Sequence, residues 1–161
     1  NTSPAAHKAT RPPNPHPVRP RRQGFGELVQ LDASFHDWLS LGPEHKITLH
    51  AGIDDATSTL TAGWFETYET LHGYCQLTKQ ILEEYGIPRI FYTDRRTVFA
   101  YLSKHHRETV RTQFQAICSQ LGIEIIATSS PQAKGRIERS FRTMQDRLLH
   151  EMKRHQISSI E

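Results

Sequence analysis

The stretch from residue 46 to residue 67, KITLHAGIDDATSTLTAGWFET, predicts two β-strands joined by a tight turn. Residues 46–54 and 60–67 are rich in β-branched and aromatic side chains, and the polar residues 54–58 between them are typical of a hairpin turn. The earlier run LVQLDAS, residues 28–34, predicts another strand. Three consecutive strands with short connections indicate an antiparallel meander at the start of the fold.

Helices and strands alternate after the meander. Residues 70–85 carry apolar side chains at helical spacing, and Gly86 followed by Pro88 ends the predicted helix. The elements expected after it are a strand at residues 89–93, a helix at 107–121, a strand at 123–128 and a long helix from residue 132. The order β-β-β-α-β-α-β-α predicts an α/β fold, a mixed five-stranded sheet flanked by helices with RNase H-like topology.

Length and composition fit one domain with an extension. The 161 residues are 36% hydrophobic with a mean hydropathy of -0.60, which is typical of a soluble globular protein with polar ends. No apolar run approaches the roughly 20 residues that a membrane-spanning helix needs, so we expect no membrane partner. Cys75 and Cys118 are too few for a disulfide framework or a zinc knuckle, and we expect both to be small buried residues.

The first residues differ in composition from the rest. Residues 1–25 contain most of the nine prolines and several arginines, with almost no apolar side chain, so they cannot bury a core. This composition predicts an extended, polyproline-like linker. The folded domain is expected at residues 26–161, and a linker before it predicts a further domain upstream.

Basic charge gathers at two places in the chain. Residues 1–26 contain five lysines and arginines and no acid, and residues 129–154 contain seven against three acids, so the remainder is net negative. This distribution favours a polyanionic partner such as DNA. A solvated tail and an ordinary surface helix explain it equally well, so charge alone does not decide between them.

Three acids stand at informative positions. Asp32 interrupts an apolar strand, where a carboxylate is costly to bury unless a cation or a donor compensates it. Asp94 directly follows the fourth predicted strand, at the sheet edge where open α/β folds bind ligands. Glu138 lies beside Ile137, at the edge of the final helix's apolar stripe, so the helix can direct it toward the strand ends. Carboxylate oxygens bind Mg²⁺ or Mn²⁺, and two such ions suit phosphodiester chemistry.

Each acid also has an ordinary explanation. Asp94 could cap a turn, and Glu138 could pair with Lys134 or Arg142, four residues away on either side. Asp32 is the hardest of the three to explain in this way. Taken together with the strand order, Asp32, Asp94 and Glu138 favour one shared metal site, in which they are both the catalytic and the metal-binding residues.

The final helix adds candidate contacts to DNA. Several cations and one amide lie on it close to Glu138, and cations beside a metal-binding carboxylate would hold phosphates across the site. The candidates for DNA binding are Lys134, Arg136, Arg139, Arg142 and Gln145. The alternative is a helix with scattered surface cations.

The segments that carry the acids resemble a known family. LDAS at Asp32, FYTDRR at Asp94 and SPQAKGRIERSF at Glu138 resemble the DDE catalytic core of bacterial insertion-sequence transposases and retroviral integrases. The most specific part is the SPQ run followed by Gly135 and Glu138. HDW at residues 36–38, TDRRTVF and QDRL are more similar to the transposase branch. The spacing differs from the family's, because 43 residues separate Asp94 from Glu138, which is more than usual.

The resemblance implies a function as well as a fold. It implies an RNase H-like catalytic core that uses two Mg²⁺ or Mn²⁺ ions, nicks DNA at transposon ends and joins them to target DNA. It implies a homo-oligomeric full-length protein with an upstream helix-turn-helix region, in the cytoplasm of a bacterium and associated with the nucleoid. Two alternatives remain open: a nuclease on the same fold, and a non-catalytic DNA-binding or assembly module derived from a transposase.

Other conspicuous residues have structural explanations. Asp54 and Asp55 are a rival pair of acids that a hairpin turn explains. His36 and Asp37 are expected at a polar strand end, and residues 105–106, both histidines, in a solvated loop without ligand spacing. The two tryptophans, Trp38 and Trp64, are expected to pack in the core or against the hairpin and not to stack on bases.

Overall fold

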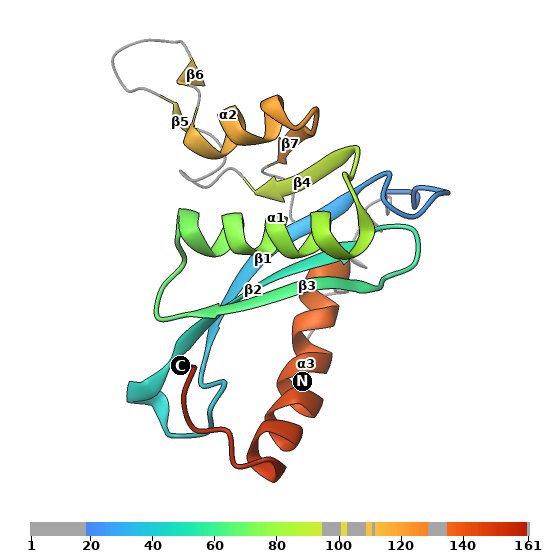
Figure 1. Ribbon diagram of the computed structural model, residues 1–161. Helices are drawn as coiled ribbons and strands as arrows, with labels where there is room; N and C mark the ends of the chain where they lie inside the picture. Colours follow the sequence, from blue (N-terminus) through green and yellow to red (C-terminus); the bar gives the residue numbers. More distant parts are fainter. Residues whose placement is uncertain (1–18, 95–100, 103–108, 111, 129–134, 161) are drawn as a thin grey trace, which may run out of the picture.

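A five-stranded sheet with helices on both faces forms the protein (Figure 1). The structure is a computed structural model that describes residues 19–94, 101–102, 109–110, 112–128 and 135–160. The strands of the sheet are β1 (Val29–His36), β2 (Ile47–Asp54), β3 (Leu60–Glu66), β4 (Ile90–Asp94) and β7 (Glu124–Thr128). The helices are α1 (Leu71–Tyr85), α2 (Gln113–Gln120) and α3 (Gly135–Arg154), with a 3-10 turn at Pro43–His45.

The sheet is mixed, with strand order β3-β2-β1-β4-β7. β1, β2 and β3 form the predicted antiparallel meander, and β4 and β7 join its β1 edge as parallel strands. β1 is therefore the central strand, antiparallel to one neighbour and parallel to the other. The predicted fold class and the order of the main elements are confirmed.

The two faces of the sheet are covered by different helices. Val29 and Leu31 of β1 lie in a core shared with α1 and α2, whereas Leu49, Ala51 and Ile53 of β2 lie in a second core with α3. Successive side chains of a strand point to opposite faces. The even-numbered residues of β1 therefore face α3, on the side of the sheet away from α1 (Figure 1).

Local signals fix the ends of α1. The side chain of Thr70 accepts a hydrogen bond from the backbone N of Gly73 at 2.9 Å, which satisfies one of the free donors of the first turn. Gly86 ends the helix with a φ of 88°, a conformation that glycine adopts without the strain of a side chain. The start and the end predicted from the sequence are both confirmed.

The predicted start of α2 is wrong by six residues. The sequence predicts a helix from residue 107, but α2 begins at Gln113 because Thr112 caps it. Thr112 and Gln115 form a reciprocal capping box, in which each side chain accepts from the other residue's backbone N. Upstream of the cap, β6 (Thr109–Val110) pairs with β5 (Tyr101–Leu102) in a two-stranded hairpin that the sequence did not predict. Residues 95–100, 103–108 and 111, between β4 and α2, lie outside the described residues.

Three of the residues expected to have structural roles have them. Trp38 is fully buried and donates from Nε1 to the carbonyl of Ser34 at 2.9 Å, so it belongs to the core. Asp37 accepts hydrogen bonds from the backbone N of Leu41 and of Gly42, so it stabilises the turn after β1. Trp64 is half-buried on β3, with its ring edge against His72.

Cys118 is fully buried in the core with α1 and α2, as predicted for a small apolar residue. Its burial, together with the neighbouring Cys75, raises the pKa of the Cys118 thiol to about 12, which makes it a poor nucleophile at neutral pH. Among the described residues, no helix combines the length and the apolar character that crossing a membrane would require.

Candidate active site

Parallel pairing of β1 with β4 brings two of the predicted acids together. The register joins Val29 to Phe91 and Gln30 to Tyr92. Continued two residues further, the same register would place Asp32 beside Asp94, on neighbouring strands about 4.8 Å apart. Asp32 is 9% exposed in the middle of β1, and the half-buried Asp94 is the last residue of β4.

Both carboxylates lie on the face of the sheet that α3 covers. Asp32 is the cross-strand partner of Ala51, and Ala51 belongs to the core with α3. Directly opposed residues of antiparallel strands share a face. On β4, Phe91 lies in the core with α1 and α2, so Asp94, three residues later, points to the other face.

Glu138 is on the flank of α3 that faces β1. Gln145 is seven residues further along the helix, and its Nε2 donates to Oγ of Ser34 on β1 at 3.4 Å. Seven residues are close to two turns of 3.6 residues, so Glu138 and Gln145 lie on the same side of the helix. Glu138 therefore lies toward β1 and β4 and not toward the far edge of the sheet.

The path of α3 passes over Asp32. In the first turn of α3, Arg136 contacts Asp55, and Asp55 also accepts a hydrogen bond from Nε2 of Gln30 at 2.9 Å. The helix thus passes β1 from the level of Gln30 toward the level of Ser34. Asp32 lies on this face between those two levels.

Glu138 does not form one cluster with Asp32 and Asp94. Glu138 is exposed, and within the described ranges no three histidine, cysteine, aspartate or glutamate side chains stand close enough to hold a metal ion. Asp32 and Asp94 lie on neighbouring strands, two residues beyond the paired Gln30 and Tyr92, and Glu138 lies on the facing helix flank. All three donors are carboxylates, a set that fits Mg²⁺ or Mn²⁺ and does not fit a soft metal.

The predicted DNA-binding residues of α3 differ in their surroundings. Arg139 and Arg142 are exposed, whereas Gln145 is half-buried against Ser34. The side chain of Arg136 is 11% exposed and forms an ion pair with Asp55. The remaining candidate, Lys134, lies outside the described residues, as do the SPQ run at 130–132 and the histidines at 105–106.

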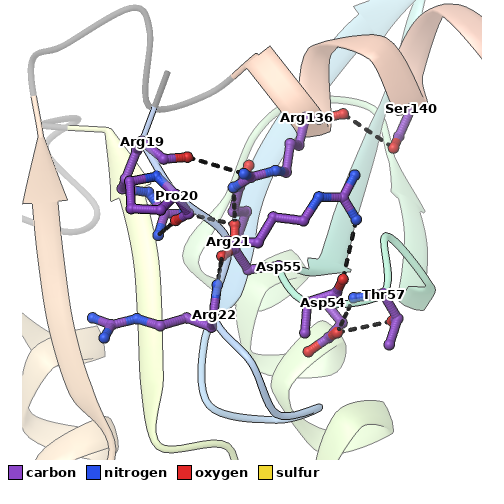
Figure 2. Close-up of polar contacts among 11 residues, drawn as sticks. Arg19, Pro20, Arg21, Arg22, Asp54, Asp55, Thr57, Arg136 and Ser140 are labelled. Carbon is purple, nitrogen blue, oxygen red and sulfur yellow. Dashed lines mark hydrogen bonds and ion pairs between the residues drawn. The ribbon is translucent and has the colours of Figure 1, made fainter. Parts of the chain in front are cut away.

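Asp55 is the centre of a buried polar network (Figure 2). The residue is fully buried, and its carboxylate accepts from Nη2 of Arg19 and Nη1 of Arg136. It also accepts from the backbone N of Arg22 at 2.8 Å and from Gln30 Nε2 at 2.9 Å. The carboxylate thus joins the segment before β1 to β1 itself and to α3.

The network keeps Asp55 ionised. Burial acts to raise the pKa of its carboxyl group, but the hydrogen bonds from Arg22 and Arg19 and the charges of Arg19 and Arg136 outweigh it and hold the pKa below the ordinary 3.8. Neighbouring Asp54 has a local task. It accepts from the backbone N and the hydroxyl of Thr57, each at 2.8 Å, as the predicted hairpin turn requires.

The sequence interpretation missed the role of Asp55. It correctly assigns residues 54 and 55 to a turn, but a turn leaves an aspartate exposed, and here the second aspartate is inside the protein. The available signal was the pair of consecutive acids after an apolar strand, together with arginines in the preceding segment. Which of these arginines would reach the pair could not be read from spacing, because Arg136 is 81 residues from Asp55.

No protein-family model matches the chain. Two curated proteins are similar to it in sequence. The transposase of insertion sequence IS1202 from Streptococcus pneumoniae is 46% identical over 153 residues, which are 93% of this chain and 32% of that protein. A predicted transposase, y4bF, from Sinorhizobium fredii is 38% identical over 139 residues, which are 86% of this chain and 30% of that protein. The chain spans about a third of the length of these relatives.

Solved structures share the fold. The intasome of simian T-cell lymphotropic virus, in complex with a PP2A regulatory subunit, contains a chain that matches with a TM-score of 0.65 and 18% identity, covering 89% of this chain and 49% of that one. The catalytic core of HTLV-2 integrase, solved in complex with magnesium, matches with a TM-score of 0.59 and 19% identity, covering 80% of this chain and 73% of that one.

The fold is therefore that of a retroviral integrase catalytic core, the RNase H-like class that the sequence predicted. The sequence relatives are the transposase of an insertion sequence and a predicted transposase. Taken together, the comparisons show that the chain is similar in sequence to transposases and similar in fold to retroviral integrase catalytic cores.

Proposed function

We propose that the chain is the catalytic core of a DDE transposase, which cuts DNA at transposon ends and joins the ends to target DNA. One argument carries the proposal: the parallel register of β1 and β4, continued two residues, would put Asp32 beside Asp94 on the face that α3 covers, and the contact of Gln145 supports a position of Glu138 on the flank toward them. The sequence relatives support the same activity, because both are named as transposases and their matches cover 93% and 86% of this chain.

The donor set supports a divalent metal cofactor. Two Mg²⁺ or Mn²⁺ ions held by shared carboxylates would lower the pKa of an attacking water or 3′-hydroxyl and stabilise the leaving oxygen. The HTLV-2 integrase core, which has this fold, was solved in complex with magnesium. Asp32, Asp94 and Glu138 would hold the ions here, and Asp32 and Asp94, as neighbours on rigid strands, would define the site.

The side chains of this chain then have distinct tasks. Asp32 and Asp94 keep their negative charges at fixed positions, because both belong to hydrogen-bonded strands. Glu138 approaches from the helix flank and completes the set. The exposed Arg139 and Arg142 lie within one turn of Glu138 and would contact DNA phosphates. We expect the full-length protein to bind DNA as a homo-oligomer in the bacterial cytoplasm.

The test is a comparison of two reactions with the 161-residue chain and with the same domain in its full-length protein. Joining of a 3′-hydroxyl transposon end to a target duplex is measured beside cleavage of an RNA–DNA hybrid, both in Mg²⁺ and in Mn²⁺. We expect metal-dependent joining and no preference for the hybrid. Preferred hybrid cleavage would indicate a nuclease instead.

The non-catalytic alternative is tested by metal binding alone. Calorimetric titration with Mn²⁺ is expected to show binding to the wild-type chain that the substitution Asp32→Asn removes. DNA binding that is indifferent to Mn²⁺, with no metal bound at millimolar concentration, would show that the domain is an assembly module and would overturn the proposal.

A further inference from the structure

The end of the segment before β1 is fixed against Asp55 and Arg136 (Figure 2). Arg19 forms an ion pair with Asp55, and its carbonyl accepts from Nη2 of Arg136 at 3.1 Å. The guanidinium of Arg19 also lies over the ring of Tyr92 on β4, 5.2 Å from the ring centroid. One residue of the preceding segment thus touches β4, α3 and the residue that follows β2.

The residues that the network contacts precede the three candidate acids by the same number of positions in the sequence. Through Arg19 and Asp55 the network reaches β1, β4 and α3, in each case two residues before a predicted metal ligand. The pairs are Gln30 and Asp32, Tyr92 and Asp94, and Arg136 and Glu138. In a strand, residues two apart share a face about 6.6 Å from each other. On β1 and β4 the network therefore lies beside the candidate acids, whereas on α3 residues two apart point to different sides of the helix, and the network holds only the turn that carries Glu138.

The interactions in this network restrict movement. Asp55 is fully buried with four donors, and the side chains of Arg19 and Arg136 are 26% and 11% exposed. A buried carboxylate with several charge-assisted hydrogen bonds holds its partners in defined positions, and removing one partner leaves the others unsatisfied. Arg136 is in the first turn of α3, so this network sets the position of that turn.

We propose that Arg19 is a positioning residue for the metal site: through Asp55 and Arg136 it holds the first turn of α3 where Glu138 can join Asp32 and Asp94. The segment before the domain thereby controls how tightly the three acids bind divalent ions. This inference rests on the proposed function, and the experiment below separates a failure of one from a failure of the other.

The test compares Arg19→Ala with Arg22→Ala in the 161-residue chain. Both substitutions remove one arginine from the same segment. Asp55 contacts Arg22 only through its backbone N, and the Arg22 side chain is exposed and points away from the network (Figure 2). Arg22→Ala is therefore the matched control, and Arg19→Lys is a second variant that keeps the charge but loses the planar fork.

Two measurements are made on each variant. Mn²⁺ affinity by calorimetry is expected to fall about 10- to 100-fold in Arg19→Ala, as is typical when a residue that supports metal ligands is lost, and to stay unchanged in Arg22→Ala. Hydrogen exchange is expected to accelerate in the first turn of α3 in Arg19→Ala but not in its last turn. A merely structural role would raise exchange throughout the domain.

The possible results have defined meanings. Wild-type binding that Asp32→Asn abolishes, with equal affinities for the two alanine variants, would overturn the positioning role and leave the proposed function intact. Absence of Mn²⁺ binding in the wild type would overturn the proposed function itself. If Arg19→Ala does not fold, Arg19→Lys decides: affinity reduced below that of Arg22→Ala supports the inference, and wild-type affinity contradicts it.

Discussion

Two buried carboxylates on one sheet face, Asp32 and Asp55, differ in what surrounds them. Asp55 sits among two guanidinium groups, a backbone N and a side-chain amide, which together compensate its charge. Asp32 lies on β1, and the neighbouring strand β4 ends in a second acid, Asp94. Neighbouring like charges favour a site that attracts cations.

The first prediction concerns this pair of acids. Asp32→Asn and Asp94→Asn are each expected to reduce strand-transfer activity by more than about 100-fold, since a metal ligand matters more than the residues that support it. The control is Glu124→Gln, which neutralises an exposed carboxylate at the first residue of β7. Near-normal activity in either aspartate variant would exclude that residue from the site.

The second prediction concerns pH and Asp55. Because the folded-state pKa of this group lies below its ordinary value of 3.8, its contribution to stability is complete above pH 3.8 and is lost as the pH falls through the lower folded value. Urea unfolding is measured at pH 5 and pH 3, about one unit on either side of the ordinary value of 3.8. The free energy of unfolding is expected to fall more steeply between these pH values in the wild type than in Asp55→Asn. A similar dependence of the free energy of unfolding on pH in both proteins would contradict a lowered pKa of Asp55.

The same substitution is expected to be costly at neutral pH. Asp55→Asn leaves the guanidinium groups of Arg19 and Arg136 without their counter-charge in a mostly buried place. We expect a loss of about 3 kcal/mol in the free energy of unfolding, the lower end for a broken buried pair, because both arginines keep some exposure to solvent. Urea unfolding at pH 7, where neutral Asn and ionised Asp differ fully in charge, measures it.

At the level of elements, α1 and β2 approach each other at one glycine. A Cβ atom built on Gly73 would stand 2.4 Å from Cε1 of His50, whose ring is fully buried. The ring is also fixed, because Nε2 accepts from the backbone N of Thr70 at 3.2 Å and Nδ1 lies 3.3 Å from the carbonyl of Trp64. Its burial lowers the pKa of His50, which keeps the ring neutral in this contact.

Gly73→Ala is therefore expected to destabilise the protein. Alanine favours a helix over glycine by about 1 kcal/mol, but overpacking against a ring that cannot move costs about 1–3 kcal/mol. The matched control is Gly135→Ala in α3, where an added Cβ has no atom within 4 Å. Thermal melting is expected to show a lower midpoint for Gly73→Ala and an equal or higher one for Gly135→Ala. The opposite order would show that His50 moves aside.

Most elements could be predicted from the sequence because local chemistry fixes them. Thr70 and Gly86 bound α1, and the polar turn after β2 joins it to β3. α2 was predicted too early because an apolar residue, Val110, suits both a helix and a strand, and its pairing with Tyr101 decides for the strand. The contact of Arg136 with Asp55 could not be predicted, because it depends on how α3 crosses the sheet.

The candidate site was predictable to a similar degree. Asp32 and Asp94 were correctly placed on strands, and the parallel register that makes them neighbours follows from the topology. The flank on which α3 carries Glu138 depends on side-chain contacts such as that of Gln145 with Ser34, which no sequence spacing specifies. The site residues themselves stay a prediction from the sequence, and packing decides how close they come.

For the whole molecule, the proposed metal site predicts stabilisation by metal. An ion that binds only the folded protein stabilises it by about 1.4 kcal/mol at ten times its dissociation constant. For a domain of this size that corresponds to a rise of about 3–6 °C in melting temperature. Differential scanning fluorimetry with Mn²⁺ is expected to show this rise in the wild type and none in Asp32→Asn. Equal shifts in both proteins would indicate binding elsewhere.

The attachment of Arg19 has a practical consequence for anyone who shortens this protein. A chain begun at residue 24, where the compact part of the sequence starts, would keep every strand of the sheet but lose the arginine that contacts Asp55, Arg136 and Tyr92. Such a truncation would be expected to purify as a folded protein and yet give a weak reaction in the test tube. The cause of the weak reaction would then be the missing arginine and not an unsuitable substrate.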